Sequence, residues 1–235
     1  MSSVNILSGG AAHGLVGSLA SAFKAQTGFE ITGEFGAVGV MADKLRKGMP
    51  ADIIILTAAL VAKLAEEKLG VATSIADVGL VETALAVRTG DPQAAVRDAA
   101  DLREALLASD AIFVPDTKAS TAGIHVANVL DRLGIADEIA SRLRIFPNGA
   151  TAMRELAASK ARRPIGCTQS TEIISTKGVT LSGSLPPGCE LATMYTAGIT
   201  IAAAHPQQAQ DLIDLLTGAG QHEQRKCAGF IGSRG

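Results

Sequence analysis

Hydrophobic and polar positions follow one another along the chain in short blocks that predict strands, turns and helices in alternation. Residues 4–8 form an aliphatic run that ends at two glycines, after which Leu15, Leu19 and Phe23 recur at helical spacing. A second strand, glycine-containing turn and helix follow, and a third strand and helix come before residue 70. Three such units in a row predict a parallel sheet with right-handed crossovers.

The middle and the end of the chain predict a second set of strands and helices. Aliphatic runs indicate strands at residues 80–87, 111–115, 144–146, 164–167, 179–185 and 191–203. Helical spacing indicates helices at residues 98–108, 135–143 and 150–161, and a long one after residue 205. This alternation is typical of an α/β fold.

No flexible linker separates the two sets of strands and helices, so we expect the chain to cross between two lobes on strands. The candidates are residues 80–87 going out and 191–203 returning. Lobe 1 would comprise residues 1–82 and 196–235, and lobe 2 residues 83–195. One continuous doubly wound sheet is the alternative that the pattern leaves open.

The composition narrows the classes of function. Hydrophobic residues make up 47% of the chain and aromatic residues only 3%, with no Trp and one Tyr. Recognition of single-stranded nucleic acid depends on aromatic platforms, and a net charge of −2 gives no general field for DNA. We therefore expect no nucleic-acid partner. The lack of a long apolar run predicts no membrane insertion.

The N-terminal residues leave two cellular locations open, and the cysteines indicate no specific chemistry. The chain enters a predicted strand at once, without a signal-peptide pattern. We expect a periplasmic protein if a leader has been removed, and a cytoplasmic one otherwise. The three cysteines form no metal-ligand pattern and allow at most one disulfide, so buried free thiols are the simpler interpretation.

Polar or glycine-containing turns follow four of the predicted strands. They lie at residues 8–13, 36–39, 118–123 and 168–171. Open α/β sheets bind ligands at the carboxyl ends of their strands, and the helix N-termini there favour anions. No turn has the Gly-Lys-Ser/Thr sequence of a phosphate loop or the full dinucleotide fingerprint. The turns together predict a site for a small oxyanion or carboxylate.

Each hydroxyl side chain in these turns also has a structural interpretation. Ser120 or Thr121, and likewise Thr168, would be good helix N-caps. Taken one at a time, each hydroxyl is better explained by capping than by ligand binding. Their position at four equivalent strand ends is what favours a shared site.

Several segments resemble the molybdate-type substrate-binding proteins of ABC transporters, a branch of the type II periplasmic-binding-protein fold. They are Gln26-Thr27-Gly28, Met49-Pro50-Ala51-Asp52 before the third strand, Tyr195-Thr196-Ala197-Gly198-Ile199, and the helix start at His205-Pro206. The resemblance implies two α/β lobes joined by two crossover strands, with a ligand cleft between them. It also implies a membrane component of an ABC transporter as partner, and neither a metal nor an organic cofactor.

Departures from that family pattern bear on the ligand. Molybdate binders usually carry serines after the first and second strands, where this chain has Ala11-Ala12-His13 and Gly36-Ala37-Val38-Gly39. The missing hydroxyls predict an anion other than molybdate. The Ser-Gly-Gly turn at residues 8–10 and the segment 165–173 resemble a divergent branch that includes aconitate isomerase. That branch implies a small polycarboxylate and an allylic proton shift.

The predicted site combines these turns with the late tyrosine. We expect the ligand to contact Gly9, Gly10, Ala11, Val38, Gly39, Ser120, Thr121, Thr168, Gln169 and Tyr195. Gln169 is the side chain expected to donate to a ligand carboxylate. His13 is the candidate catalytic base, with a surface or capping histidine and a cationic ligand contact as alternatives. Glu172 is either an acid–base group or a carboxylate that complements a helix dipole.

Two functions from different classes remain open on the sequence. The first is a solute-binding protein of the molybdate-transporter type that binds a different small anion in the cleft between the lobes. The second is a cofactor-free isomerase of the aconitate-isomerase type, with His13 as base. A cytoplasmic ligand sensor is a third alternative.

Overall fold

The chain folds into two α/β units, and the computed structural model describes residues 2–232 of it. Unit 1 consists of Met1–Val81 and Thr193–Gly235, and unit 2 of Glu82–Ala192. Residue 1 and residues 233–235, which we assigned to lobe 1, lie outside the described residues. The chain leaves unit 1 within the long strand β4 (Ala76–Arg88) and returns at the start of β9 (Ala192–Ile199), as predicted for two crossover strands.

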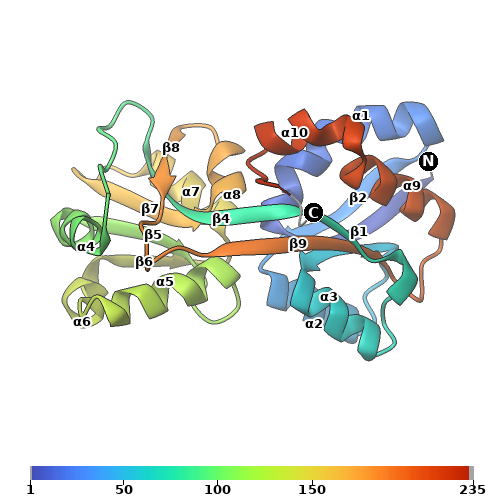
Figure 1. Cartoon of the computed structure of the whole chain (residues 1–235), viewed down its shortest axis with the longest axis horizontal. Helices are drawn as coiled ribbons and strands as arrows, with labels where there is room; N and C mark the ends of the chain where they lie inside the picture. Colours follow the sequence, from blue (N-terminus) through green and yellow to red (C-terminus); the bar gives the residue numbers. More distant parts are fainter. Residues whose placement is uncertain (1, 233–235) are drawn as a thin grey trace. The chain divides into compact units, whose positions relative to one another are not determined.

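Unit 1 is built on strands in the order β2-β1-β3-β9. Strands β1 (Ser3–Gly9), β2 (Glu30–Gly36) and β3 (Ile53–Thr57) are parallel, and β9 runs antiparallel to β3. Figure 1 shows α1, α9 and α10 on one face of this sheet, and α2 and α3 on the other. The helices of unit 1 are α1 (His13–Thr27), α2 (Val38–Arg46), α3 (Ala58–Glu66), α9 (Pro206–Thr217) and α10 (His222–Cys227), with single 3-10 turns at η1 (Gly10–Ala12), η2 (Ala72–Ser74) and η4 (Ala219–Gln221).

The central strands of unit 1 are aliphatic along their length because helices cover both faces of the sheet. Ile6 and Leu7 of β1 and the first four residues of β3 are at most 1% exposed. Burying one such side chain contributes about 1.5–3 kcal/mol. The predicted strand 191–203 is too long: β9 ends at Ile199, where the Thr200 N–H donates to the Asp52 carbonyl and the Thr200 hydroxyl to the Ala51 carbonyl.

Asp52 connects neighbouring segments at the amino edge of the unit 1 sheet. Its carboxylate is 3% exposed and accepts the backbone N–H groups of Asn5 and His205, each at 2.8 Å. These bonds connect the start of β3 to β1 and to the residue that precedes α9. Asp52 therefore has a structural role.

Unit 2 is built on strands in the order β4-β7-β5-β6, with β8 also paired to β4. Strands β5 (Ala111–Pro115), β6 (Leu143–Phe146) and β7 (Pro164–Gln169) are parallel, whereas β4 and β8 (Val179–Ser184) run antiparallel to their neighbours. The helices of unit 2 are α4 (Ala99–Ala108), α5 (Thr121–Arg132), α6 (Ala136–Ile139), α7 (Gly149–Ala158) and α8 (Ser170–Ile174), with a 3-10 turn at η3 (Ala140–Arg142).

The two faces of the unit 2 sheet carry separate apolar clusters. One joins α4, α5 and α6 to the sheet and includes Ile165 and Cys167 of β7. The other joins α7 and α8 to it through Met153, Leu156 and Ile173. Alternate residues of β7 thus point to opposite helical layers. Two predicted helices are shorter than expected, because residues 135–143 divide into α6 and η3 and because Ser159 is extended and ends α7.

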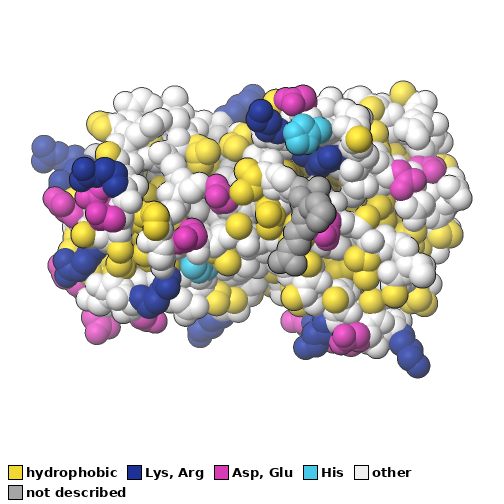
Figure 2. Space-filling model, viewed as in Figure 1, with side chains coloured by type: hydrophobic (Ala, Val, Ile, Leu, Met, Phe, Trp, Pro, Cys, Tyr) yellow, Lys and Arg dark blue, Asp and Glu magenta, His cyan; other side chains and the backbone are white. Residues whose placement is uncertain are grey.

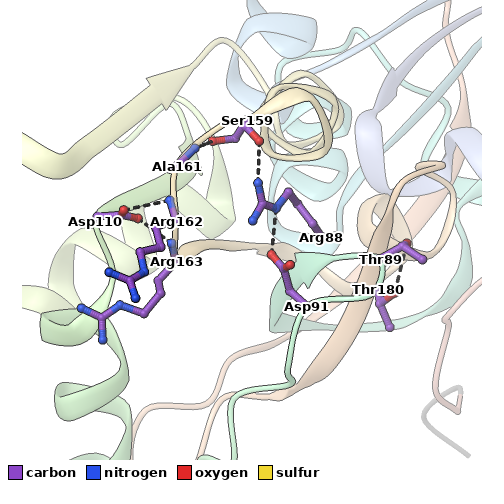
Figure 3. A network of polar contacts seen from close by, with 9 residues as sticks. All are labelled: Arg88, Thr89, Asp91, Asp110, Ser159, Ala161, Arg162, Arg163 and Thr180. Carbon is purple, nitrogen blue, oxygen red and sulfur yellow. Dashed lines mark hydrogen bonds and ion pairs between the residues drawn. The ribbon is translucent and has the colours of Figure 1, made fainter.

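Polar contacts fix the amino edge of the unit 2 sheet (Figure 3). The Asp110 carboxylate accepts the backbone N–H groups of Arg162 and Arg163, each at 2.9 Å, and the Arg163 N–H is the main reason that the pKa of Asp110 lies below its ordinary value. Arg88 donates to the Asp91 carboxylate and to the Ser159 carbonyl. These contacts hold together the segments that precede β5 and β7.

Charges of both signs are interspersed on the face of the molecule seen in Figure 2, with Lys and Arg side chains beside Asp and Glu. Such mixing gives no extended field of one sign on that face. Among the described residues, no helix combines the length and the apolar character that crossing a membrane requires.

Candidate functional site

The carboxyl edge of the unit 1 sheet brings together the starts of two helical segments. Strands β1 and β2 end in register at Gly9 and Gly36, and η1 and α2 begin immediately beyond them. The N-cap residues Gly9 and Ala37 make no side-chain capping bond, so the first N–H groups of these segments have no partner within the helix. The predicted ligand residues in these turns, Gly10, Ala11, Val38 and Gly39, therefore share one edge rich in backbone donors.

Tyr195 packs at the same edge. It is opposite Thr57, the last residue of β3, and is 3% exposed. A Cβ atom placed on Gly9 would lie 2.8 Å from Tyr195 Cε1 and 2.8 Å from Val38 Cγ1. Only glycine fits between these side chains without displacement, so the structure brings Gly9, Val38 and Tyr195 into contact.

His13 is the first residue of α1 and is exposed. Its ring lies edge-on to Phe35, with ring centroids 4.6 Å apart, and its backbone N–H donates to the Gly10 carbonyl. The side chain therefore stands beside the end of β2 rather than capping a helix, so the capping alternative is wrong. An exposed imidazole can exchange protons with solvent or with a ligand.

Thr168 and Glu172 form the buried centre of the carboxyl edge in unit 2. The Thr168 hydroxyl donates to Glu172 Oε2 at 2.6 Å, and the two residues are 0% and 5% exposed. A Cβ atom on Gly149 would lie 1.9 Å from that carboxylate oxygen and 2.1 Å from the Thr168 hydroxyl. Gly149 thus lets the N-terminus of α7 approach the carboxylate closely, and Thr168 does not act as a helix cap.

Two opposing effects act on the pKa of the Glu172 carboxyl group. Burial raises its pKa, and this effect is opposed by the Thr168 hydroxyl and by the backbone N–H groups of Ala150, Gln169 and Gly149. Two of these N–H groups belong to the first turn of α7. Glu172 therefore accepts hydrogen bonds at the positive end of α7, in keeping with the helix-dipole interpretation, while its burial disfavours the charged form.

Gln169 ends β7 and is 3% exposed, but neither its amide nitrogen nor its amide oxygen has a hydrogen-bond partner among the described residues. It is paired in register with Thr83 of β4, whose hydroxyl is also buried and without a partner there. Residues directly opposite each other in an antiparallel pair point to the same face of the sheet. Counting along β7 from Cys167, this is the face that α5 covers.

Ser120 and Thr121 stand where α5 begins, after β5, which is the parallel neighbour of β7. Ser120 is the N-cap residue, but its side chain makes no capping bond, so the expectation that it caps the helix is wrong. The preceding loop is held by the Asp116 carboxylate, which accepts the N–H groups of Lys118 and Ala119. The start of α5 therefore leaves backbone donors at the strand ends of unit 2.

Two further side chains near this edge are structural. His125 of α5 forms a hydrogen bond of 2.8 Å between Nε2 and the Cys189 carbonyl. Burial raises the pKa of the Cys167 thiol to about 12, so this cysteine is inert at neutral pH. Cys189 is also a buried free thiol, whereas Cys227 is free and exposed. Within residues 2–232, no three His, Cys, Asp or Glu side chains come together as metal ligands.

Sequence reasoning missed Thr83, and it placed Thr171 in a predicted turn but not among the ligand residues. The buried hydroxyls of both have no partner in the described part of the chain. Thr83 interrupts an aliphatic strand, and a lone hydroxyl at a core-facing position was the available signal. Gly149 was missed because its importance depends on Glu172, which is distant in sequence.

A cavity of about 260 Å³, lined in part by Val87, Arg163 and Pro164, lies at the opposite end of β7 from Gln169.

A family model described as bacterial extracellular solute-binding protein matches residues 4–230. The chain therefore belongs to this family of solute-binding proteins. Aconitate isomerase from Pseudomonas sp. is 21% identical over 224 residues, which cover 92% of this chain and 82% of that protein.

Solved structures share the fold of this chain. The periplasmic molybdate-binding protein of Azotobacter vinelandii superposes with a TM-score of 0.81 at 18% identity, covering 98% of this chain and 100% of that one. The sulfate-binding protein of Mycobacterium tuberculosis H37Rv gives 0.75 at 17% identity, covering 98% and 86%. These similarities confirm the predicted type II periplasmic-binding-protein fold with two α/β lobes, and the alternative of one doubly wound sheet is wrong.

Proposed function

We propose that the chain is a solute-binding protein that binds a small anion, an oxyanion or a di- or tricarboxylate, and delivers it to the membrane component of an ABC transporter. The observation that carries this proposal is the set of helix starts without side-chain caps at the carboxyl ends of parallel strands, in unit 1 at η1 and α2 and in unit 2 at α5. Such helix starts favour anions. A delivery role implies a periplasmic location.

Backbone donors alone would bind many anions, so the neighbouring side chains are needed to indicate which anion is bound. In unit 1 the turns offer Ala11, Ala37 and Val38, and the nearby Ser8 hydroxyl already donates to the Gly9 carbonyl. Relatives bind molybdate and sulfate, according to their names. The lack of free hydroxyls in these turns favours a ligand other than molybdate.

A thermal-shift panel tests anion binding directly. The panel contains molybdate, tungstate, sulfate, phosphate, citrate, and cis- and trans-aconitate. A ligand that binds only the folded state raises the melting temperature. At one hundred times its Kd it adds about 2.7 kcal/mol to the free energy of unfolding. We expect a shift with at least one carboxylate or oxyanion other than molybdate. A response to none of them would overturn the proposal, and a response to molybdate alone would overturn the choice of ligand.

A cofactor-free isomerase is the second candidate, and the similarity to aconitate isomerase favours it. In this reaction a base takes a proton from the carbon next to a carboxylate, the double bond shifts by one position, and a proton is returned at the far carbon. His13, exposed beside Phe35, is the candidate base. NMR of cis- or trans-aconitate with the protein would show interconversion, and His13→Ala should abolish it. Full conversion by His13→Ala would exclude this role for His13.

A further inference from the structure

We propose that the ligand of the unit 2 strand ends is a small hydroxycarboxylate, which offers a hydroxyl donor to Gln169 together with an anionic oxygen. The proposal rests on the anion-binding function proposed above and names the class of anion. Its basis is a group of uncharged polar side chains that are buried at the end of β7 without partners.

Gln169 is the central observation. A side-chain amide carries two N–H donors and an oxygen acceptor, and buried polar atoms are nearly always hydrogen-bonded. In Gln169, which is 3% exposed, both Nε2 and Oε1 have no partner among the described residues. The side chain therefore requires a donor and an acceptor at the same time.

Thr83 and Thr171 extend this group. Thr83 is paired in register with Gln169 and is 1% exposed, and Thr171 lies two residues beyond Gln169 and is 2% exposed. The Oγ1 atoms of both are buried without partners in the described chain. Glu172 cannot serve as the missing acceptor, because Thr168 and backbone N–H groups already occupy its carboxylate.

The chemistry of this group separates two classes of anion. Sulfate, molybdate and simple carboxylates at neutral pH offer only acceptors, so they pair with Nε2 and leave Oε1 without a donor. A hydroxycarboxylate pairs its carboxylate with Nε2 and donates its O–H to Oε1. Leaving one buried acceptor unpaired weakens binding by about tenfold to a hundredfold.

Isothermal titration with ligand pairs that differ by one hydroxyl tests the proposal on the full chain. The pairs are citrate with tricarballylate, and malate with succinate. We expect the hydroxylated member of at least one pair to bind about tenfold more tightly or better. Gln169→Met keeps the length of the side chain and removes both polar atoms, so it should bring this preference close to unity.

Control variants separate the role of Gln169 from general effects. Gln207→Met makes the same exchange at an exposed position of α9 and should leave the preference unchanged. Thr83→Val tests the neighbouring hydroxyl should Gln169→Met fail to fold, and it should reduce the same preference. Equal affinities within both pairs for the wild-type chain, or a preference that persists in Gln169→Met, would overturn the inference and leave anion binding intact. The absence of binding by these acids and by every anion of the thermal-shift panel would overturn the proposed function itself.

Discussion

The strand ends of the two units offer different chemistry on the same plan of parallel strands followed by helices. In unit 1 the turns consist of glycine, alanine and valine, and the donors are backbone N–H groups at the starts of η1 and α2. In unit 2 the end of β7 carries a run of buried polar residues from Thr168 to Glu172. The donors of these unit 1 turns thus belong to the main chain, whereas unit 2 adds buried polar side chains to the backbone donors at the start of α5.

This difference separates two tasks of recognition. Backbone N–H groups at helix starts attract any anion of suitable size. An amide or a hydroxyl side chain discriminates, because a ligand that lacks the matching group leaves a buried atom unpaired. We therefore expect unit 1 to supply affinity for negative charge and unit 2 to supply the choice among anions.

The largest effect should come from Gly149→Ala, which adds a methyl group where the Glu172 carboxylate lies. The new Cβ would stand 1.9 Å from Glu172 Oε2, so the buried carboxylate must move away from the start of α7. Overpacking and the loss of these contacts should destabilise the chain by about 3 kcal/mol, measured by urea unfolding.

Gly17→Ala provides the control for that substitution. It makes the same exchange within α1, where an added Cβ meets no atom within 4 Å, and it should stabilise the chain by about 0.5–1 kcal/mol. If Gly149→Ala unfolds at the same urea concentration as the wild type, the close approach of Glu172 to α7 is not needed for stability.

Gly9→Ala should have a smaller effect in unit 1. Its Cβ would lie 2.8 Å from the Tyr195 ring and from Val38 Cγ1, and side chains can give way more easily than a buried carboxylate. We expect a loss of about 1–2 kcal/mol in urea unfolding. A variant as stable as the wild type would mean that Tyr195 and Val38 are not tightly packed against this turn.

The buried carboxyl group of Glu172 in unit 2 should make the stability of the chain depend on pH. Burial raises the pKa of Glu172 above the ordinary value of 4.5, so the folded chain keeps this proton after the unfolded chain has lost it. The folded state then binds more protons, and the free energy of unfolding falls as the pH rises from 4.5 through the raised pKa. Glu172→Gln should remove the part of this fall in the free energy of unfolding that Glu172 causes.

Unfolding in urea across that pH range measures the effect. Glu104→Gln, at an exposed position of α4, controls for the loss of one negative charge. A pH profile of Glu172→Gln that parallels the wild type and the control would show that Glu172 does not contribute to the pH dependence.

The sequence predicted those parts of the fold and the site that depend on local pattern. Aliphatic runs and glycine turns identified the parallel strands, and the turns predicted at residues 36–39 and 118–123 contain the observed starts of α2 and α5. Gln169 could be singled out because it lies in the polar turn that follows the predicted strand 164–167. Neighbouring segments of the chain contain all the information that these predictions used.

The parts that could not be predicted depend on pairing between distant segments. Thr83 faces Gln169 only through the antiparallel register of β4 and β7. The role of Glu172 depends on the first turn of α7, which precedes it by some twenty residues and carries a glycine that looks ordinary in the sequence. The capping predicted for Ser120 failed because the Asp116 carboxylate holds that loop instead.

The most direct test of the difference between the units is to remove one backbone donor from unit 1. Val38→Pro deletes the N–H at the first position of α2, where proline is tolerated, and the preceding Ala37 already has the extended conformation that proline requires (φ −62°, ψ 132°). Ala99→Pro makes the same change at the start of α4, where the extended residue Asp98 caps the helix with its side chain, and serves as the control. The measurement is isothermal titration with citrate and tricarballylate.

We predict that Val38→Pro weakens the binding of both acids by about tenfold or more, the effect of one lost charge-assisted hydrogen bond, and leaves the ratio of the two Kd values as in the wild type. Ala99→Pro should change neither Kd. Undiminished affinity in Val38→Pro, or a collapse of the ratio in that variant, would contradict the separation of affinity in unit 1 from selectivity in unit 2.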